Sequence, residues 1–93
     1  AALESSVRYL ASNLGEDGIR VNAVSAGPIK TLSAKGIQNF SSILDVVEKS
    51  APLKRNVTTT EVGNVISFLC SPLSSSITGQ VIYADNGYSI MGL

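Results

Sequence analysis

The chain has 93 residues, of which 44% are apolar and 15% charged, and its seven basic and seven acidic side chains cancel. This composition predicts a packed core and excludes a disordered tail. The balanced charge excludes a strong net attraction to nucleic acid or an anionic membrane, and no apolar run reaches the roughly 20 residues that span a bilayer. One cysteine, Cys70, cannot form an internal disulfide, which favours a reducing, cytoplasmic-type compartment.

The first elements predicted are a helix and a strand. Residues 3–14 carry one apolar stripe at helical spacing, formed by Leu3, Val7, Leu10, Ala11 and Leu14. We expect Gly15 to end this helix in the left-handed conformation. After the turn "GEDG", the run "IRVNAVS" over residues 19–25 has β-branched residues and a single charge, which predicts a strand largely buried in a sheet.

Two further helices and a second strand follow. Residues 31–40 have weak periodicity and are interpreted as a loop or a short helix, and the next helix should begin at Ser41 or Ser42 and run through Lys49. Thr58 and Glu61 are spaced as a capping box before another helix. Its apolar stripe consists of Val62, Val65, Ile66 and Leu69. A strand from about residue 80 to 84 and a turn at Asn86-Gly87 complete the chain.

Strands separated by helices predict the α/β class, with a parallel sheet covered by helices. Two strands leave large faces and edges unpaired, so we expect the rest of the sheet to come from elsewhere. The chain also starts without Met inside a helical pattern, from which we expect a missing N-terminal portion. In open α/β sheets, ligands bind beyond the carboxyl ends of the strands, which is where "SAGPIKT" at residues 25–31 should lie.

Four stretches, "AALESSVRYLA", "GIRVNAVSAGPIKTLSAKGI", "APLKRNVTTTEVG" and "ITGQVIYADNGY", occur in this order and cover nearly the whole chain. Together they resemble the carboxyl-terminal third of bacterial enoyl-(acyl-carrier-protein) reductases, a divergent branch of the short-chain dehydrogenase/reductase superfamily. Ordinary carbonyl-reducing relatives tend to have Pro-Gly where this chain has Gly27-Pro28, so "SAGPIKT" is the most specific of these motifs.

The resemblance implies that residues 1–93 are the C-terminal segment of one Rossmann-type, doubly wound parallel sheet domain. It also implies NADH or NADPH as cofactor, enoyl-acyl carrier protein as substrate in fatty acid elongation, and a cytoplasmic homo-oligomer, a tetramer. The cofactor-binding residues it implies are Gly27, Pro28, Ile29, Lys30, Thr31, Leu32 and Ser33. A substrate-binding loop at about residues 31–42 would contact the acyl chain through Leu32, Ala34, Ile37 and Phe40.

The residues alone leave plainer interpretations open. Gly27 and Pro28 are common at strand ends, a loop hydroxyl such as Thr31 often bonds to local backbone, and the apolar residues of 31–42 could pack under a loop. In the family, the glycine-rich phosphate loop, the ribose-selecting residue and the catalytic Tyr and Lys all precede this segment. We therefore expect no catalytic residue here and an inactive isolated chain.

Other chemically capable residues are interpreted as structural. Tyr9, Tyr83 and Tyr88 have no Lys at i+4 to assist acid-base chemistry, which favours core or interface roles. Cys70 ends an apolar stripe and is predicted to be a buried thiol. With no His and no carboxylate cluster, metal binding is not expected. A basic rim for acyl carrier protein or a solvated face would each account for Lys35, Lys54 and Arg55.

Two alternatives remain beside the enoyl reductase. One is a 3-ketoacyl reductase segment of the same superfamily, which "SAGP" and the long segment after it disfavour. The other is a non-enzymatic oligomerisation module, in which the helices and the last strand serve only assembly. Nucleotide binding in the presence of the missing part would separate the enzyme from the module.

Overall fold

A computed structural model describes residues 1–29 and 40–92, and only the backbone of residues 40 and 41. Its main elements follow the predicted order of helix, strand, helix, helix and strand. They are α1 (Ala2–Leu14), β1 (Ala23–Ala26), α2 (Phe40–Ser50), α3 (Thr59–Leu69) and β2 (Val81–Ala84). Short 3-10 turns lie at Gly15–Asp17, Pro72–Ser74 and Tyr88–Met91.

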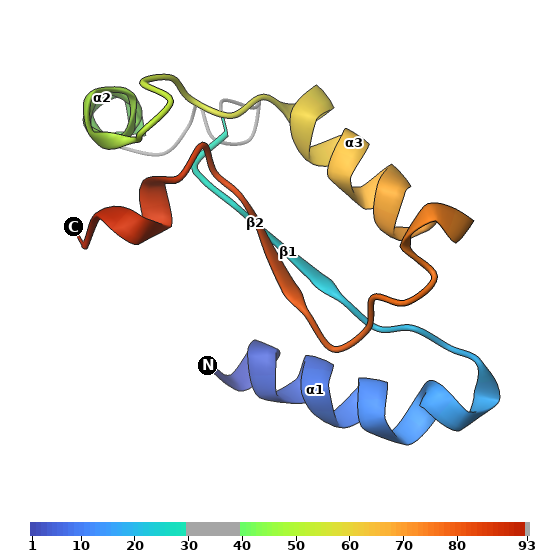
Figure 1. Ribbon diagram of the computed structural model, residues 1–93. Helices are drawn as coiled ribbons and strands as arrows, with labels where there is room; N and C mark the ends of the chain where they lie inside the picture. Colours follow the sequence, from blue (N-terminus) through green and yellow to red (C-terminus); the bar gives the residue numbers. More distant parts are fainter. Residues whose placement is uncertain (30–39, 93) are drawn as a thin grey trace.

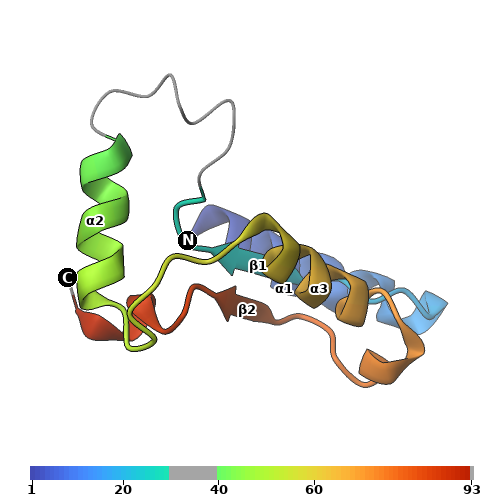
Figure 2. The same cartoon turned by 90° about the horizontal axis from the view of Figure 1, so that it is seen from above.

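The two strands form the centre of the described fold. β1 and β2 pair in parallel, with Ala23 opposite Val81 and Ala26 opposite Ala84. Figure 1 shows α1 and α3 on opposite sides of this strand pair, and Figure 2 shows α2 at the end toward which both strands point. The predicted parallel α/β arrangement is confirmed.

The end of α1 differs from the prediction. Gly15 has right-handed backbone angles, φ −59° and ψ −38°, and continues into a 3-10 turn. The left-handed residue is Gly18, with φ 75°. Both glycines allow a positive φ, and the additional turn decides which of them adopts it. The apolar stripe is also only partly covered, since Val7 and Ala11 are buried while Leu3 is 70% exposed.

β1 begins at Ala23, not at Ile19 as predicted, and its residues are half-buried or exposed rather than largely buried. The residues before it bond to an irregular segment instead of a strand. The Val21 N–H donates to Thr78 Oγ1 at 3.1 Å, and the Val21 carbonyl accepts from the Gly79 N–H at 2.8 Å. Regular pairing therefore starts only where β2 approaches.

Arg20 joins the start of β1 to the segment after α3. Its guanidinium donates to Ser74 Oγ at 3.0 Å, to the Ile77 carbonyl at 3.2 Å and to the Ser71 carbonyl at 3.3 Å. Asn22 adds a bond from Nδ2 to the same Ile77 carbonyl at 3.0 Å. These bonds hold the entry to β2 beside the entry to β1, which places the two carboxyl ends side by side.

The chain is more open than a self-sufficient domain of its size. Its accessible surface of 6355 Å² exceeds the about 5,100 Å² expected for a folded monomer of this mass. Its radius of gyration of 15.2 Å also exceeds the about 12 to 13 Å expected for this length. Large apolar side chains on α1 and α3, among them Leu3, Leu10, Ile66 and Phe68, are exposed. The exposed apolar faces of α1 and α3 are therefore suited to packing against further protein.

Candidate functional site at the carboxyl edge of the sheet

The carboxyl ends of the two strands bring Gly27 and Asp85 together. A Cβ built on Gly27 would lie 3.5 Å from Asp85 Cβ and 4.0 Å from Val57 Cγ1, both ordinary contact distances. Gly27 and Asp85 directly follow the last paired residues of their strands, and Val57 directly precedes the cap of α3. Three distant parts of the sequence thus meet at this edge, which is the edge where the ligand was predicted.

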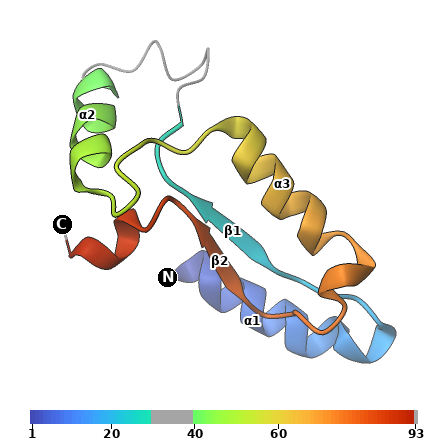
Figure 3. The same cartoon turned by 45° about the horizontal axis from the view of Figure 1, so that its top comes forward.

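Asp85 organises the turn after β2. It is buried, and its Oδ1 accepts from the Gly87 N–H at 3.1 Å while its Oδ2 accepts from the Ser89 N–H at 2.9 Å. The neighbouring Asn86 donates from Nδ2 to the Arg55 carbonyl at 2.9 Å. Figure 3 shows this turn leading to the last 3-10 turn, beside α2. Our sequence interpretation missed this role of Asp85, although an Asp two residues before Gly is a known turn signal.

The predicted cofactor residues divide into a described and an undescribed group. Gly27, Pro28 and Ile29 are half-buried and follow β1 directly. Among the described residues, none forms a hydrogen bond to the backbone of Gly27 or Ile29. The remaining predicted residues, Lys30, Thr31, Leu32, Ser33, Ala34 and Ile37, lie outside the described residues. Phe40 is the first residue of α2, and its side chain is likewise outside the description.

A cavity of about 300 Å³ lies beside Ile29. Leu44 of α2, together with Asn56 and Val57, forms part of its wall, and Thr58 and Thr59 at the start of α3 also line it. Asn56 donates from Nδ2 to the Leu44 carbonyl at 3.2 Å and so joins this segment to α2. Asn56 was not among the predicted site residues, and no local motif in the sequence points to it.

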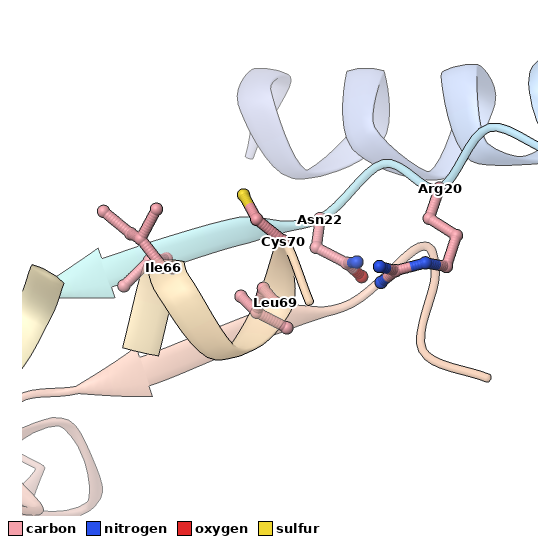
Figure 4. Close-up of a pocket in the computed structure, with 6 residues that line it drawn as sticks. Arg20, Asn22, Ile66, Leu69 and Cys70 are labelled. Carbon is pink, nitrogen blue, oxygen red and sulfur yellow. The ribbon is translucent and has the colours of Figure 1, made fainter. Parts of the chain in front are cut away.

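A second cavity, of about 350 Å³, lies between β1 and the end of α3 (Figure 4). Arg20 and Asn22 line it, and both side chains are already bonded to the chain itself. Cys70 also lines this cavity and is exposed, so the prediction of a buried thiol is wrong. It occupies the C-cap position of α3, one residue beyond Leu69, which is the last residue of the helix and is buried.

Two of the three basic residues considered for a rim, Lys54 and Arg55, bond to the chain itself. Arg55 forms an ion pair with Glu61, with a nitrogen to oxygen distance of 2.8 Å. The hydrogen bond from Arg55, together with that from the Thr58 N–H, lowers the pKa of Glu61 from 4.5 to about 2. Lys54 donates to the Lys49 carbonyl at 2.8 Å, and Lys35 is outside the described residues. Arg55 is therefore a paired group of the α3 cap.

Two of the three tyrosines are exposed and the third is half-buried. Tyr9 and Tyr83 are exposed, which leaves the interface role of the predicted pair of roles for both, whereas Tyr88 is half-buried. The Tyr83 hydroxyl approaches Glu4 Oε1 at 3.4 Å. Within residues 1–29 and 40–92, no cluster of three or more metal-ligating side chains is found. No helix of this described part is long and apolar enough to cross a membrane.

Comparison of the sequence with known proteins identifies the family of this chain. The family model described as enoyl-(acyl carrier protein) reductase matches residues 1–89, and the chain belongs to this family. The chain is 56% identical over 92 residues to enoyl-(acyl-carrier-protein) reductase (NADH) FabI of Bacillus cereus, covering 99% of this chain and 36% of that protein. It is 57% identical over 88 residues to the corresponding reductase (NADPH) FabI of Staphylococcus aureus, covering 95% and 34%.

A solved structure gives the same result for the fold. The crystal structure of the Bacillus cereus enoyl-acyl carrier protein reductase with NADP+ and indole naphthyridinone matches with a TM-score of 0.91 at 57% identity, covering 98% of this chain and 35% of that one. The Rossmann-type fold class is thereby confirmed. The chain spans about a third of the length of these relatives.

Proposed function

We propose that these residues form part of an enoyl-(acyl-carrier-protein) reductase, which reduces a trans-2-enoyl thioester with NADH or NADPH in fatty acid elongation. The observation that carries the proposal is the segment Gly27–Ile29, called the cofactor turn below because it is where the chain leaves the sheet. It leaves the carboxyl end of β1 beside the end of β2, and its backbone forms no hydrogen bond to another described residue. Family membership makes a nicotinamide the group that this turn would contact.

The Ile29 backbone suits the nicotinamide carboxamide, which offers one acceptor and two donor hydrogens. A Cβ on Gly27 would point toward Asp85 and Val57 and not into an empty space. The part of this turn that a ligand could contact is therefore its backbone. When bound, the nicotinamide supplies the hydride that adds to the β-carbon of the enoyl thioester. Within this chain, Ile29 would orient the ring, and Pro28 would restrict the backbone that carries it.

The remaining contacts are proposed from the sequence. Lys30, Leu32 and Ser33 would approach the cofactor through their main chain, and Thr31 would contact its pyrophosphate. Four apolar side chains would cover the acyl chain and exclude water, which would otherwise compete for the developing enolate and its proton. These side chains are Leu32, Ala34, Ile37 and Phe40. No catalytic residue is assigned to this segment, because the family's Tyr and Lys precede it.

Substrate specificity of the complete reductase tests the proposal directly. We expect it to bind NADH or NADPH and to oxidise the cofactor with trans-2-enoyl thioesters, but not with 3-ketoacyl thioesters. The 93-residue chain alone should give no turnover. Reduction of 3-ketoacyl thioesters alone would favour the ketoacyl reductase, and a complete protein without nucleotide affinity would favour the oligomerisation module.

The variant Thr31→Val tests the side-chain contact within this site. It keeps the shape of the side chain and removes one hydroxyl, and a hydrogen bond to a charged oxygen contributes about 1.5 to 3 kcal/mol. Cofactor affinity measured by calorimetry should therefore fall roughly 10- to 150-fold. Phe40→Ala is the control, since it should affect the acyl substrate and leave cofactor affinity unchanged. Unchanged cofactor affinity in Thr31→Val would leave only the backbone contacts.

We further propose that the reductase is a cytoplasmic homo-oligomer, a tetramer. The exposed apolar side chains of α1, Leu3, Tyr9 and Leu10, support association, because large exposed apolar patches commonly mark interfaces. The single cysteine supports a reducing compartment. Light scattering of the complete protein should give a tetramer mass, and a stable monomer would contradict the assembly.

A further inference from the structure

The turn after β2 contains the pair Asn86-Gly87, and Asn86 is the only asparagine of the chain that a glycine follows. In such a pair, the backbone nitrogen of the glycine can attack the asparagine carboxamide and form a cyclic imide, since glycine has no side chain to obstruct the ring. The other asparagines are followed by alanine or by larger side chains. By sequence, Asn86 is therefore the asparagine most prone to this reaction.

The backbone geometry of the turn selects this pair. Asn86 has φ 58° and Gly87 has φ 86°, so both residues adopt the left-handed conformation that glycine and asparagine tolerate best. Gly87 also lies against Pro52, where a Cβ would be 2.8 Å from Pro52 Cγ. At position 86, Nδ2 donates to the Arg55 carbonyl at 2.9 Å, and the backbone carbonyl accepts from the Leu53 N–H at 3.3 Å. The fold thus retains a chemically labile pair for structural reasons.

The same turn holds both reacting groups in hydrogen bonds. The attacking nitrogen must lose its proton, but the Gly87 N–H donates to Oδ1 of the buried Asp85 at 3.1 Å, and a carboxylate acceptor favours retention of that proton. The second carboxylate oxygen accepts from the Ser89 N–H at 2.9 Å, which fixes the position of the first. The Asn86 carboxamide is restrained by its bond to the Arg55 carbonyl. In the closed turn, these bonds oppose the reaction.

We propose that Asn86 is a latent modification site, which converts to aspartate and isoaspartate when the turn opens, and that Asp85 suppresses the conversion in the folded protein. On opening, the Gly87 nitrogen gives up its proton and bonds to Cγ of Asn86, while the bond from Cγ to Nδ2 breaks and ammonia leaves. Water then adds to either carbonyl of the imide and opens the ring. Water is the only co-reactant, and no group is oxidised or reduced.

Neither product fits the closed turn. In aspartate, a carboxylate oxygen replaces Nδ2 and would face the Arg55 carbonyl, so an acceptor meets an acceptor beside the Asp85 carboxylate. Isoaspartate routes the backbone through its side-chain carbon and lengthens the turn, which should displace the Gly87 N–H from Asp85. Conversion should therefore prevent the turn from closing again. This inference concerns the stability of the carboxyl edge and does not depend on the proposed function.

Deamidation rates of the complete protein test the site. The protein is incubated at mildly alkaline pH with and without denaturing urea, and tandem mass spectrometry of its peptides gives the rate at Asn86. The bond from Gly87 to a carboxylate must open before reaction, so the folded protein should react at least about 10-fold more slowly than the unfolded protein. Asn64 is the internal control, because it is exposed and followed by Val65, and it should react more slowly than Asn86 in urea.

Removal of Asp85 tests its protecting role. Asp85→Ala keeps the Cβ that faces Gly27 and removes the carboxylate, so the folded variant should deamidate at Asn86 about 10- to 150-fold faster than the parent. Asp45→Ala, which removes an exposed carboxylate from α2, is the matched control and should leave the rate unchanged. If Asp85→Ala does not fold, the parent in urea below its unfolding transition replaces it. The rate at Asn86 should then rise in parallel with hydrogen exchange of the Gly87 N–H.

Each part of the proposal has a result that overturns it. An Asn86 that stays intact in urea would overturn the modification site, and equal rates in the folded and unfolded protein would overturn the protection. An unchanged rate in Asp85→Ala, or a rate that does not follow Gly87 exchange, would overturn the role of Asp85. For the consequence, Asn86→Asp imitates one product, whereas Asn86→Gly tolerates the same φ without a reactive amide. Asn86→Asp should have the lower melting temperature, and the reverse order would contradict the misfit of the product.

Discussion

Gly87 lies directly against the ring of Pro52. A Cβ built on Gly87 would be 2.8 Å from Pro52 Cγ, closer than such atoms approach one another in proteins, and 3.0 Å from Pro52 Cδ, which is a tight contact. Gly87 also has φ 86°, in the left-handed region that favours glycine. Two independent constraints therefore select glycine at this position, and both act on the turn that Asp85 organises.

The variant Gly87→Ala should consequently be among the most destabilising single changes in this segment. The positive φ costs about 1 to 2 kcal/mol in an L-residue, and the overlap with Pro52 adds about 1 to 3 kcal/mol. Gly18→Ala is the matched control, because Gly18 has φ 75° but nothing within 4 Å of a Cβ. Urea unfolding of the complete protein should show a clearly larger loss for Gly87→Ala. Equal losses would mean that the contact with Pro52 relaxes.

Replacing Arg20 by Lys should destabilise the protein although the charge is kept. Lys has a single nitrogen and cannot reproduce three bonds to Ser74, Ile77 and Ser71 from one planar group. We expect a loss of about 1 to 3 kcal/mol in the free energy of unfolding. Arg8→Lys is the control, since Arg8 is exposed and has one long bond of 3.4 Å to Ser5. Similar stabilities of the two variants would contradict the role of Arg20.

Thr58 caps α3, and its removal should weaken the helix start. Its Oγ1 accepts from the Glu61 N–H at 3.1 Å, and the Thr58 N–H donates to Glu61 Oε1 at 3.0 Å. Thr58→Ala should reduce the free energy of unfolding by about 1 kcal/mol. Thr60→Ala removes an exposed threonine from the first turn of the same helix and should cost less. Thermal unfolding of both variants provides the comparison, and a costlier Thr60→Ala would argue against the cap.

The ion pair between Arg55 and Glu61 predicts a dependence on acid pH. The folded state lowers the pKa of Glu61 from 4.5 to about 2, so the unfolded state takes up a proton at higher pH than the folded state does. The stabilisation is present above pH 4.5 and is lost as the pH falls toward about 2. High salt should weaken the effect, because both side chains are solvent-accessible.

The variant Arg55→Gln should move the pKa of Glu61 back toward 4.5, because the hydrogen bond from Arg55 is the largest cause of the shift. Side-chain carboxyl chemical shifts of Glu61, followed from pH 6 to pH 2 by NMR, measure this directly. Lys54→Gln removes a neighbouring cation that bonds to the Lys49 carbonyl instead, and it should leave the titration unchanged. A Glu61 pKa that stays low in Arg55→Gln would assign the shift to the bond from Thr58.

The elements that were predicted well from the sequence are those stabilised by residues close to one another along the chain. The capping box of α3 joins residues three apart, and the helical and β-strand patterns reflect neighbouring side chains on one face. The family motifs, including "SAGPIKT", are also contiguous. These features required only the order of residues along the chain, and they were sufficient to predict the α/β class and the edge of the sheet where the proposed site lies.

The tertiary structure decided which distant groups meet. Arg20 bonds to residues more than fifty positions away, and the bonds of Val21 to Thr78 and Gly79 leave regular pairing of β1 to start at Ala23. Likewise, the approach of Asp85 to Gly27 and the bond from Asn56 Nδ2 to the Leu44 carbonyl have no local signature. Local preferences depend on a few neighbouring dihedral angles, whereas these contacts exist only after helices and strands have packed. The sequence by itself therefore determined the elements and the family, and the packing determined the composition of the site.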